Sequence, residues 1–318
     1  MKSFLFLFMI FFSLSGYALE TDNYFVWNKE LRDSSSYIDR YFEEKISEAL
    51  TTITSPETKT CEQVTIEIAH NFASHLVHDN PVENWLFSVL SAEEIIPATL
   101  NWVEESIYRE PYMFYIPWFG LAPNIQVNGF YFGTDKLSHF ASTGMIYYKI
   151  FQRELSKTKN TDLALKAAID WGVRDEKSVH GFWASGVFSF ADLESNYQGL
   201  RFYRNFCEGN SPYLQKKPSG HWSLSNKPAI KDFVSGLWDE SFNLSYRLPD
   251  NWEKVKSAIS AYCELSHSPE VKERMKYYSQ KIPVSFSQNY LEDLKTSGGA
   301  PSPEPSQSFV GLCRNFRL

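Results

Sequence analysis

Apolar residues recur at intervals of three and four along much of the chain, which is the spacing of one face of an α-helix. The first such stretch has Tyr37, Ile38, Tyr41, Phe42, Ile46 and Leu50, with charged residues between them. The same spacing predicts helices over 61–76, 92–108 with a break near Pro97, 134–156, 161–178, 189–206, 232–243, 251–265 and 270–279. Ser189 stands where an N-cap residue is expected. The pattern therefore predicts an all-α fold, a helical bundle with few or no strands.

A long aromatic-rich loop interrupts the helical pattern at 111–133, because its prolines and glycine cannot belong to a regular helix. It carries eight aromatic residues between Tyr112 and Phe132, Trp118 and Tyr131 among them. The loop could be ordinary core, a patch at a membrane interface or a wall for stacking sugars. It leads directly into Asp135, so we favour a lid or wall of a binding site. Short strands are expected only within 111–133 and 283–290.

The N-terminus has the pattern of a secretory signal peptide. Lys2 precedes an apolar run that ends at Leu14, and Gly16-Tyr17-Ala18 fits a small-x-small cleavage site after Ala18. We expect a signal peptide at 1–18 and a single large helical domain at 19–293. Residues 294–308, rich in Gly, Pro and Ser, are expected to be a flexible linker before a tail at 309–318. The protein is thus predicted to be exported, either periplasmic or secreted.

The composition bears on the class of partner and on the state of the cysteines. The chain of 318 residues has 31 Lys+Arg and 38 Asp+Glu, a net charge of −7, which argues against binding nucleic acid. In an oxidising compartment Cys61, Cys207, Cys263 and Cys313 are candidates for two disulfides. Four cysteines allow three pairings, and the sequence does not choose among them.

Polar residues lie at unusual places in the three central helices. Asp135 and His139 are i,i+4 neighbours on one helix, and Asp192 and Asn196 are i,i+4 neighbours on another. Glu176 lies near the end of the helix between them. If the three helices pack together, these side chains converge in one polar centre. Gly199, one turn after Asn196, would let another backbone or a ligand come close.

These residues carry a resemblance to a known family. Gly133-Thr134-Asp135-Lys136-Leu137-Ser138-His139-Phe140, then Glu176, then the stretch from Ser189 to Gly199 follow the pattern DKxxHF … E … SxxDLxxNxxG. The series resembles the YfiM-like and VanZ-like envelope proteins between Gly133 and Arg204, within a predicted core at 133–206. The resemblance implies a local architecture, an envelope setting and polar roles for Asp135, His139, Glu176, Asp192 and Asn196. It implies no particular reaction.

Several chemistries suit this residue set. Asp135, His139, Glu176 and Asp192 could bind a divalent metal ion that activates water. Without a metal, Asp135 could orient His139 as a general base while Glu176 acts as the acid. A third alternative pairs Glu176 with Asp192 or Glu194 around a glycosidic bond.

The residues could instead form a structural network that fixes the register of the helices. The sequence favours an enzyme, a hydrolase of cell-wall glycan or of a lipid-linked precursor. Its predicted catalytic residues are Glu176, His139 and Asp192, and its predicted binding residues are Asp135, Asn196, Glu194, Trp118 and Tyr131. A non-enzymatic module that binds a membrane surface or a partner is the alternative.

Overall fold

A computed structural model describes residues 20–72, 81–96, 105–109, 121–178, 180–183, 185–303 and 309–313. The described part is mostly helical, as predicted, with short antiparallel strand pairs. The helices are α2 Ser35–Thr52, α3 Cys61–Ala69, α4 Pro81–Val89, α7 Asp135–Ser138, α8 Gly144–Thr158, α9 Thr161–Glu176, α10 Phe190–Arg204, α11 Pro249–Ser260, α12 Pro269–Gln280, α13 Phe286–Ser297 and α14 Phe309–Cys313.

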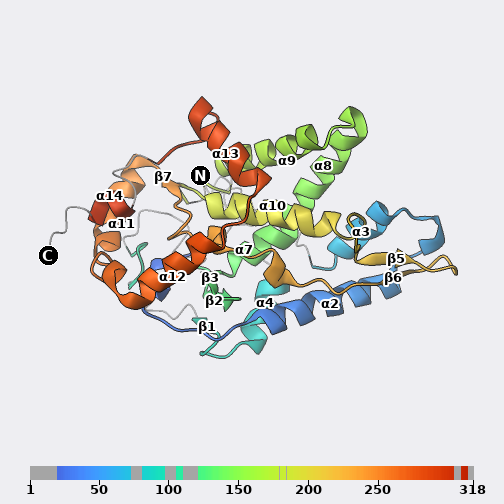
Figure 1. Cartoon of the computed structure of the whole chain (residues 1–318), viewed down its shortest axis with the longest axis horizontal. Coiled ribbons are helices and arrows are strands. Elements are labelled where there is room, and N and C mark those ends of the chain that lie inside the picture. Colours follow the sequence, from blue (N-terminus) through green and yellow to red (C-terminus); the bar gives the residue numbers. More distant parts are fainter. Residues whose placement is uncertain are drawn as a thin grey trace, which may run out of the picture.

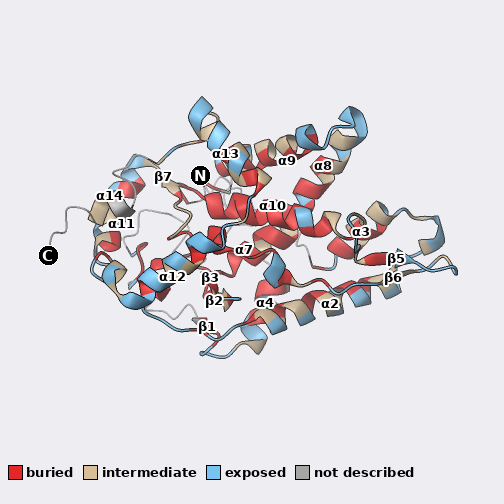
Figure 2. Cartoon of the chain, viewed as in Figure 1, coloured by how far each residue is buried: buried red, intermediate tan, exposed pale blue. Residues whose placement is uncertain are grey.

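Helix α10 runs through the middle of the molecule, with α8 and α9 above it and α2 and α4 below it in the view of Figure 1. Almost every residue of α10 is buried, polar ones included (Figure 2). Its N-cap is Ser189, as predicted, and the Ser189 Oγ accepts a hydrogen bond from the Asp192 backbone N–H at 3.1 Å. A helix surrounded by protein on all sides can keep polar residues only where each finds a partner. The partners of these residues define the candidate site below.

The close approach of α8 and α10 depends on two glycines. A Cβ atom on Gly199 would lie 2.0 Å from the Phe140 carbonyl oxygen and 2.9 Å from the Gly144 Cα. A Cβ on Gly144 would lie 2.7 Å from the Gly199 Cα. The expectation that Gly199 lets another backbone come close is therefore confirmed.

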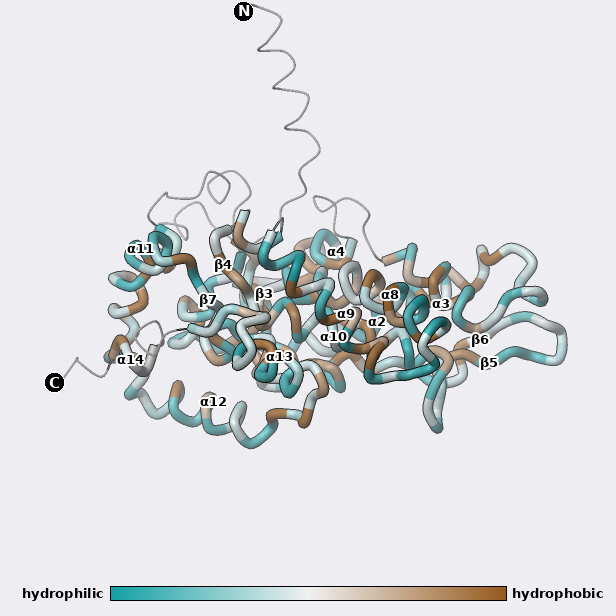
Figure 3. The backbone as a smooth tube through the Cα atoms, turned by 90° about the horizontal axis from the view of Figure 1, so that it is seen from above, coloured by the Kyte–Doolittle hydropathy of each residue, from teal (hydrophilic) through white to brown (hydrophobic). Residues whose placement is uncertain are grey.

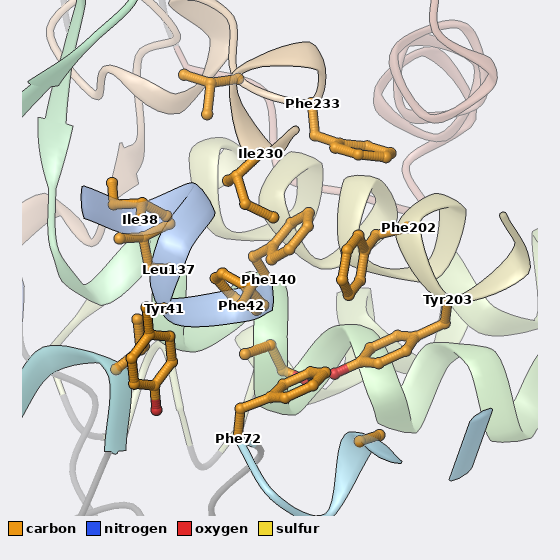
Figure 4. Close-up of a cluster of buried hydrophobic side chains, with 14 of the residues drawn as sticks. Ile38, Tyr41, Phe42, Phe72, Leu137, Phe140, Phe202, Tyr203, Ile230 and Phe233 are labelled. Carbon is orange, nitrogen blue, oxygen red and sulfur yellow. The ribbon is translucent and has the colours of Figure 1, made fainter. Parts of the chain in front are cut away.

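An aromatic core fills the space between α2, α10 and the helix that begins at α7. The rings of Phe42 and Phe140 are 5.9 Å apart, and the rings of Phe42 and Phe202 are 5.5 Å apart (Figure 4). Edge-to-face pairs at such distances are favourable beyond the area that they bury. Phe42, Phe140 and Phe202 therefore belong to one aromatic core.

The strands are β1 Ile95–Ile96, β2 Asn124–Val127, β3 Phe130–Gly133, β4 Val187–Phe188, β5 Leu214–Lys216, β6 Trp222–Leu224 and β7 Tyr246–Arg247. They form the sheet β1-β2-β3 and the pairs β4-β7 and β5-β6, all antiparallel. The β5–β6 hairpin lies at the end of the molecule opposite α11 and α14 (Figures 1 and 3).

Several expectations about elements need correction. The predicted helix 92–108 is wrong at 95–96, which form β1, and α4 was not predicted. The strand expected within 283–290 is wrong because α13 begins at Phe286, whereas β2 and β3 confirm strands within 111–133. Phe130 and Phe132 of the aromatic loop are ordinary core residues, and residues 110–120 lie outside the described ranges.

The predicted linker 294–308 begins too early. Helix α13 continues to Ser297, and Ala300 is buried against the cluster that contains Leu165 and Leu291. The Lys177 Nζ donates a hydrogen bond to the Gly299 carbonyl at 2.7 Å, and the Ala300 N–H donates to the Leu294 carbonyl at 3.0 Å. Packing against α9 and α13 gives this Gly- and Ala-containing stretch a fixed place that its composition does not suggest.

The four cysteines form two pairs at disulfide distance, Cys61 with Cys207 and Cys263 with Cys313. The first pair joins α3 to the end of α10, and the second joins the segment after α11 to α14. Such pairs fit an exported protein. In the described residues, no helix combines the length and the apolar character that crossing a bilayer requires.

The glycine contact at the α8–α10 crossing gives a first prediction. An alanine inside a helix normally stabilises it relative to glycine by about 1 kcal/mol. At position 199 the added methyl meets backbone atoms, so Gly199→Ala should instead destabilise the protein by about 1–3 kcal/mol, the usual cost of overpacking. Urea unfolding of both proteins measures the difference, and an unchanged or raised stability would show that the two helices can move apart.

Candidate functional site

The ammonium group of Lys136 is the centre of a buried polar cluster. Its Nζ lies 2.7 Å from Asp135 Oδ2, 2.6 Å from Asp192 Oδ1 and 2.6 Å from Glu240 Oε1, and the side chain has no exposed surface. We call Asp135, Lys136, His139, Glu176, Asp192, Asn196 and Glu240 the Lys136 cluster. A lysine is almost never fully buried unless its charge is paired, so these contacts explain how the sequence tolerates it.

Two helix beginnings bring the carboxylates together. Asp135 is the first residue of α7, and Asp192 lies in the first turn of α10, where the helix dipole favours a negative charge. The cap residue Ser189 connects two further acids to this point. Its backbone N–H donates to Glu176 Oε2 at 3.1 Å, and its hydroxyl donates to Glu240 Oε1 at 3.0 Å.

The imidazole of His139 is held at both nitrogens. Nε2 lies 3.3 Å from Asp192 Oδ2, and Nδ1 lies 3.1 Å from Asn196 Oδ1. His139 begins a π-helical turn, His139–Thr143, between α7 and α8. Such turns are rare and are frequent at functional sites. The predicted convergence of His139, Asp192 and Asn196 is thus present in the structure.

The expected pairing of Asp135 with His139 is wrong. Asp135 Oδ1 accepts a hydrogen bond from the Thr21 hydroxyl at 2.7 Å, and Oδ2 faces Lys136. The i,i+4 spacing allowed a contact between Asp135 and His139, but a charged neighbour and a distant threonine satisfy the carboxylate instead. Asp192 is the acid that orients His139.

The segment 20–23 packs against the cluster. All four of its residues, Glu20, Thr21, Asp22 and Asn23, are buried. Asn23 Oδ1 accepts a hydrogen bond from the Glu240 backbone N–H at 2.8 Å, and its Nδ2 donates to Asn124 Oδ1 at 2.6 Å. A segment directly after the predicted cleavage point therefore completes the polar centre.

Burial and charge displace the pKa values of the acids in this region in different directions. Burial, together with the negative charges of Glu240 and Asp192, raises the pKa of Glu20 to about 8. Burial and the Asp192 charge raise the pKa of Glu176 well above its usual range. Burial also acts to raise the pKa of Asp192, but His139 and Lys136 outweigh it and lower that pKa. The surroundings therefore favour the protonated form of Glu176 and the ionised form of Asp192.

The residues do not fit a resident divalent metal ion. Carboxylate oxygens of Asp135, Asp192 and Glu240 lie within 4.8 Å of one another, which is a donor set that could hold an ion. However, the Lys136 ammonium stands within 2.7 Å of all three. Three carboxylates raise the pKa of Lys136 although burial acts to lower it, so the lysine stays charged. Two of the predicted ligands, Asp135 and Asp192, thus contact a cation that the chain itself supplies.

Two predicted binding residues, Glu194 and Tyr131, lie apart from the cluster. Glu194 is two residues after Asp192 and faces away from it, because successive helix residues are rotated by about 100°. Its carboxylate accepts hydrogen bonds from Gln198 at 2.6 Å and from Ser285 at 3.3 Å, which ties α10 to the start of α13. The Tyr131 hydroxyl accepts from the Leu31 N–H at 3.3 Å, and Arg274 lies over the Tyr131 ring. Trp118 lies outside the described residues.

The sequence pattern assigned no role to Lys136, Glu20 or Glu240, which the structure places in or beside the buried polar centre. Lys136 lies inside the DKxxHF pattern, and its place between an aspartate and an apolar helix face was the only available signal. Glu20 and Glu240 are far from the pattern, and no spacing rule connects them to it. A second pair, His180 Nδ1 with Asp175 Oδ2 at 2.7 Å, lies just after α9 and is partly exposed.

A comparison with models of known protein families finds no match, and comparisons with curated proteins and with solved structures find none either. The resemblance of 133–204 to the YfiM-like and VanZ-like proteins therefore stays a prediction.

Removal of the Lys136 charge should strongly lower the free energy of unfolding. In Lys136→Met three carboxylates lose their buried counter-ion, and breaking such a pair costs about 3–5 kcal/mol. The loss in unfolding free energy should shrink at low pH, where the carboxylates take up protons. Chemical denaturation at pH 5 and pH 8 measures both effects. Lys157→Met, which removes an exposed lysine on α8, should change little, and an equal effect of the two substitutions would contradict a special role for Lys136.

The raised pKa of Glu20 predicts the direction of a pH dependence. The folded protein holds the Glu20 proton up to a pKa of about 8, whereas the ordinary value is 4.5. Between these values the folded state binds the extra proton, so stability falls as pH rises from about 5 to 8. In Glu20→Gln this slope should be smaller by at most about 1.4 kcal/mol per pH unit. Thermal melts across this range test it, and the exposed Glu57→Gln variant should keep the wild-type slope.

Proposed function

We propose that this protein is an exported cell-envelope hydrolase that acts on cell-wall glycan or on a lipid-linked precursor. The Lys136 cluster would be its acid–base centre. The predicted signal peptide, the two cysteine pairs at disulfide distance and the negative net charge support an envelope setting without nucleic acid.

The observation that carries the proposal is that the pKa values of Glu176 and Asp192 are displaced in opposite directions within one buried cluster. Both side chains are buried in one cluster, yet their pKa values are displaced in opposite directions. Two acids held in opposite protonation states are the arrangement that general acid–base catalysis uses. A network that served only packing would not require this difference.

Each residue then has a role in hydrolysis. A water molecule gives a proton to the His139–Asp192 pair as its oxygen bonds to the phosphorus or anomeric carbon. The bond to the leaving oxygen breaks, and that oxygen takes the proton of Glu176. Lys136 keeps Asp192 ionised throughout, and Asn196 fixes the imidazole ring. Protons pass back from the pair to Glu176 to restore the starting state.

The exposed fractions of the side chains favour an approach of substrate from the His139 side of the cluster. His139 is 8% exposed and Asp192 5%, whereas Lys136 has no exposed surface and Glu176 is 2% exposed. A substrate would thus approach His139 and Asp192 first, while Lys136 stays out of reach as a counter-ion.

A structural network is the second candidate, and the complete burial of Lys136 favours it. The ammonium joins α7, α10 and the loop that carries Glu240, and such a tie could set the positions of these segments without any reaction. Under this alternative, the protein would be a binding module of the envelope. Substitutions in the cluster would then change stability alone.

The turnover rates of conservative variants distinguish a hydrolase from a structural network. Purified mature protein should release products from peptidoglycan or polyprenyl-phosphate-linked glycan, followed by liquid chromatography and mass spectrometry. Glu176→Gln and Asp192→Asn remove a proton donor and a base while keeping shape, so the rate should fall about 10²–10⁴-fold. The rate of the His139→Gln variant should fall by a factor in the same range.

Glu194→Gln is the matched control, since Glu194 is an equally buried acid of α10 outside the cluster. It should keep the wild-type rate. Wild-type protein that leaves every substrate unchanged, with and without divalent metals, would contradict the hydrolase. Variants that lose thermal stability but no activity would favour the structural network.

A further inference from the structure

Arg247 is a buried cation whose surroundings contrast with those of Lys136. It is 4% exposed. Within the described ranges its guanidinium makes a hydrogen bond only to the Tyr108 hydroxyl, from Nη2 at 3.3 Å. Its Nε–H is buried and finds no hydrogen-bond partner among the residues that the structure describes. An arginine cannot escape this cost by losing its proton, and a buried charge is normally paired.

The strand pairing fixes the direction of this side chain. Arg247 of β7 lies opposite Val187 of β4, so the two side chains project from the same face. Val187 belongs to an apolar cluster with Tyr24, Trp27, Ile107, Tyr108, Leu121 and Trp252. The neighbours Phe188 and Tyr246 pack in a different cluster on the other face. Arg247 is therefore directed toward an aromatic, apolar environment.

The two acids whose charges act on Arg247, Asp22 and Glu240, already have other hydrogen-bond partners. The Asp22 carboxylate accepts hydrogen bonds from the backbone N–H groups of Tyr24 at 3.0 Å and of Ile107 at 2.8 Å. Glu240 Oε1 faces Lys136, and its Oε2 accepts from the Ser245 hydroxyl at 3.2 Å. Both acids act on Arg247 through their charge. In the described part of the chain, neither forms an ion pair with it.

We infer that Arg247 is the binding residue for a phosphate group of the substrate. A guanidinium presents donors in a planar fork that matches phosphate oxygens, and charge-assisted bonds of this kind are strong. The aromatic cluster around Arg247 suits an apolar body attached to that phosphate. The identity of the ligand rests on the proposed function. Of the two substrate classes proposed there, a phosphate site favours the lipid-linked precursor over free glycan.

Position supports the link to the Lys136 cluster. Val187, opposite Arg247, is two residues before Ser189, whose N–H and hydroxyl hold Glu176 and Glu240. A phosphate at Arg247 would thus lie on the side of the cluster where Glu176 and Glu240 meet the cap of α10.

Equilibrium binding tests this without any turnover. Titration calorimetry on the mature full chain would use polyprenyl monophosphate in non-ionic detergent micelles, the corresponding polyprenol in the same micelles, and inorganic phosphate in buffer. Wild-type protein should bind the polyprenyl phosphate and bind the alcohol at least about tenfold more weakly, since charged hydrogen bonds contribute about tenfold or more in affinity.

Arg247→Gln should weaken binding of the phosphate about tenfold or more, and Arg247→Lys should weaken it less because it keeps the charge but loses the fork. Arg153→Gln, which removes an exposed arginine of α8, should bind like the wild type. If Arg247→Gln does not fold, Arg247→Lys decides the result. Inorganic phosphate bound as tightly as the lipid would support the anion site and assign it to free phosphate.

Absence of binding by every phosphate compound, or wild-type affinity in both Arg247 variants, would overturn the inference. The two proposals can fail separately. Binding that depends on Arg247 without product formation would sustain the phosphate site and contradict the hydrolase. Product formation by a protein whose affinity for the phosphate does not depend on Arg247 would sustain the hydrolase and contradict the phosphate site.

Discussion

A single ammonium group buried among three carboxylates constrains the centre of this protein. Lys136 contacts Asp135 beside it, Asp192 on α10 and Glu240 on a distant loop, all within 2.7 Å. Desolvation of so many charges costs several kcal/mol per ion and is tolerated only with good geometry and further hydrogen bonds. Ser189, Thr21 and Ser245 supply those bonds to Glu240 and Asp135. The positions of α7, α10, the segment 20–23 and the loop at 240 are therefore mutually dependent.

The cluster also sets the chemistry of its surroundings. Because His139 and Lys136 lower the pKa of Asp192, its ionised form is favoured, and its negative charge helps to raise the pKa of Glu176. Among the described residues Arg247 forms no ion pair with an acid, so one buried cation, Lys136, is paired with carboxylates and the other is not. The proposed phosphate site depends on this contrast, since a buried cation is normally paired within the fold.

Much of the helical framework could be predicted from the chain. The spacing of apolar residues gave α2, α9, α10, α11 and α12 to within a few residues, since an amphipathic face is a local property. Ser189 was recognised as a cap for the same reason. The segment 232–243 shows the limit: its apolar residues suggested a helix, but the structure has short 3₁₀ turns at Ile230–Asp232 and Gly236–Trp238. Trp238 and Phe233 are held there by contacts with Phe140 from a distant helix.

By itself the sequence determined which residues could carry chemistry: His139, Glu176, Asp192 and Asn196 were identified from their spacing and their positions on helices. Only the tertiary structure decided their partners. It paired His139 with Asp192 rather than Asp135, placed Lys136 where a metal ion was considered, directed Glu194 toward α13 and brought Glu20 and Glu240 into the centre. The physical reason is that helix periodicity depends on residues three or four apart, whereas the energy of a buried charge depends on whatever the fold places within a few ångströms of it.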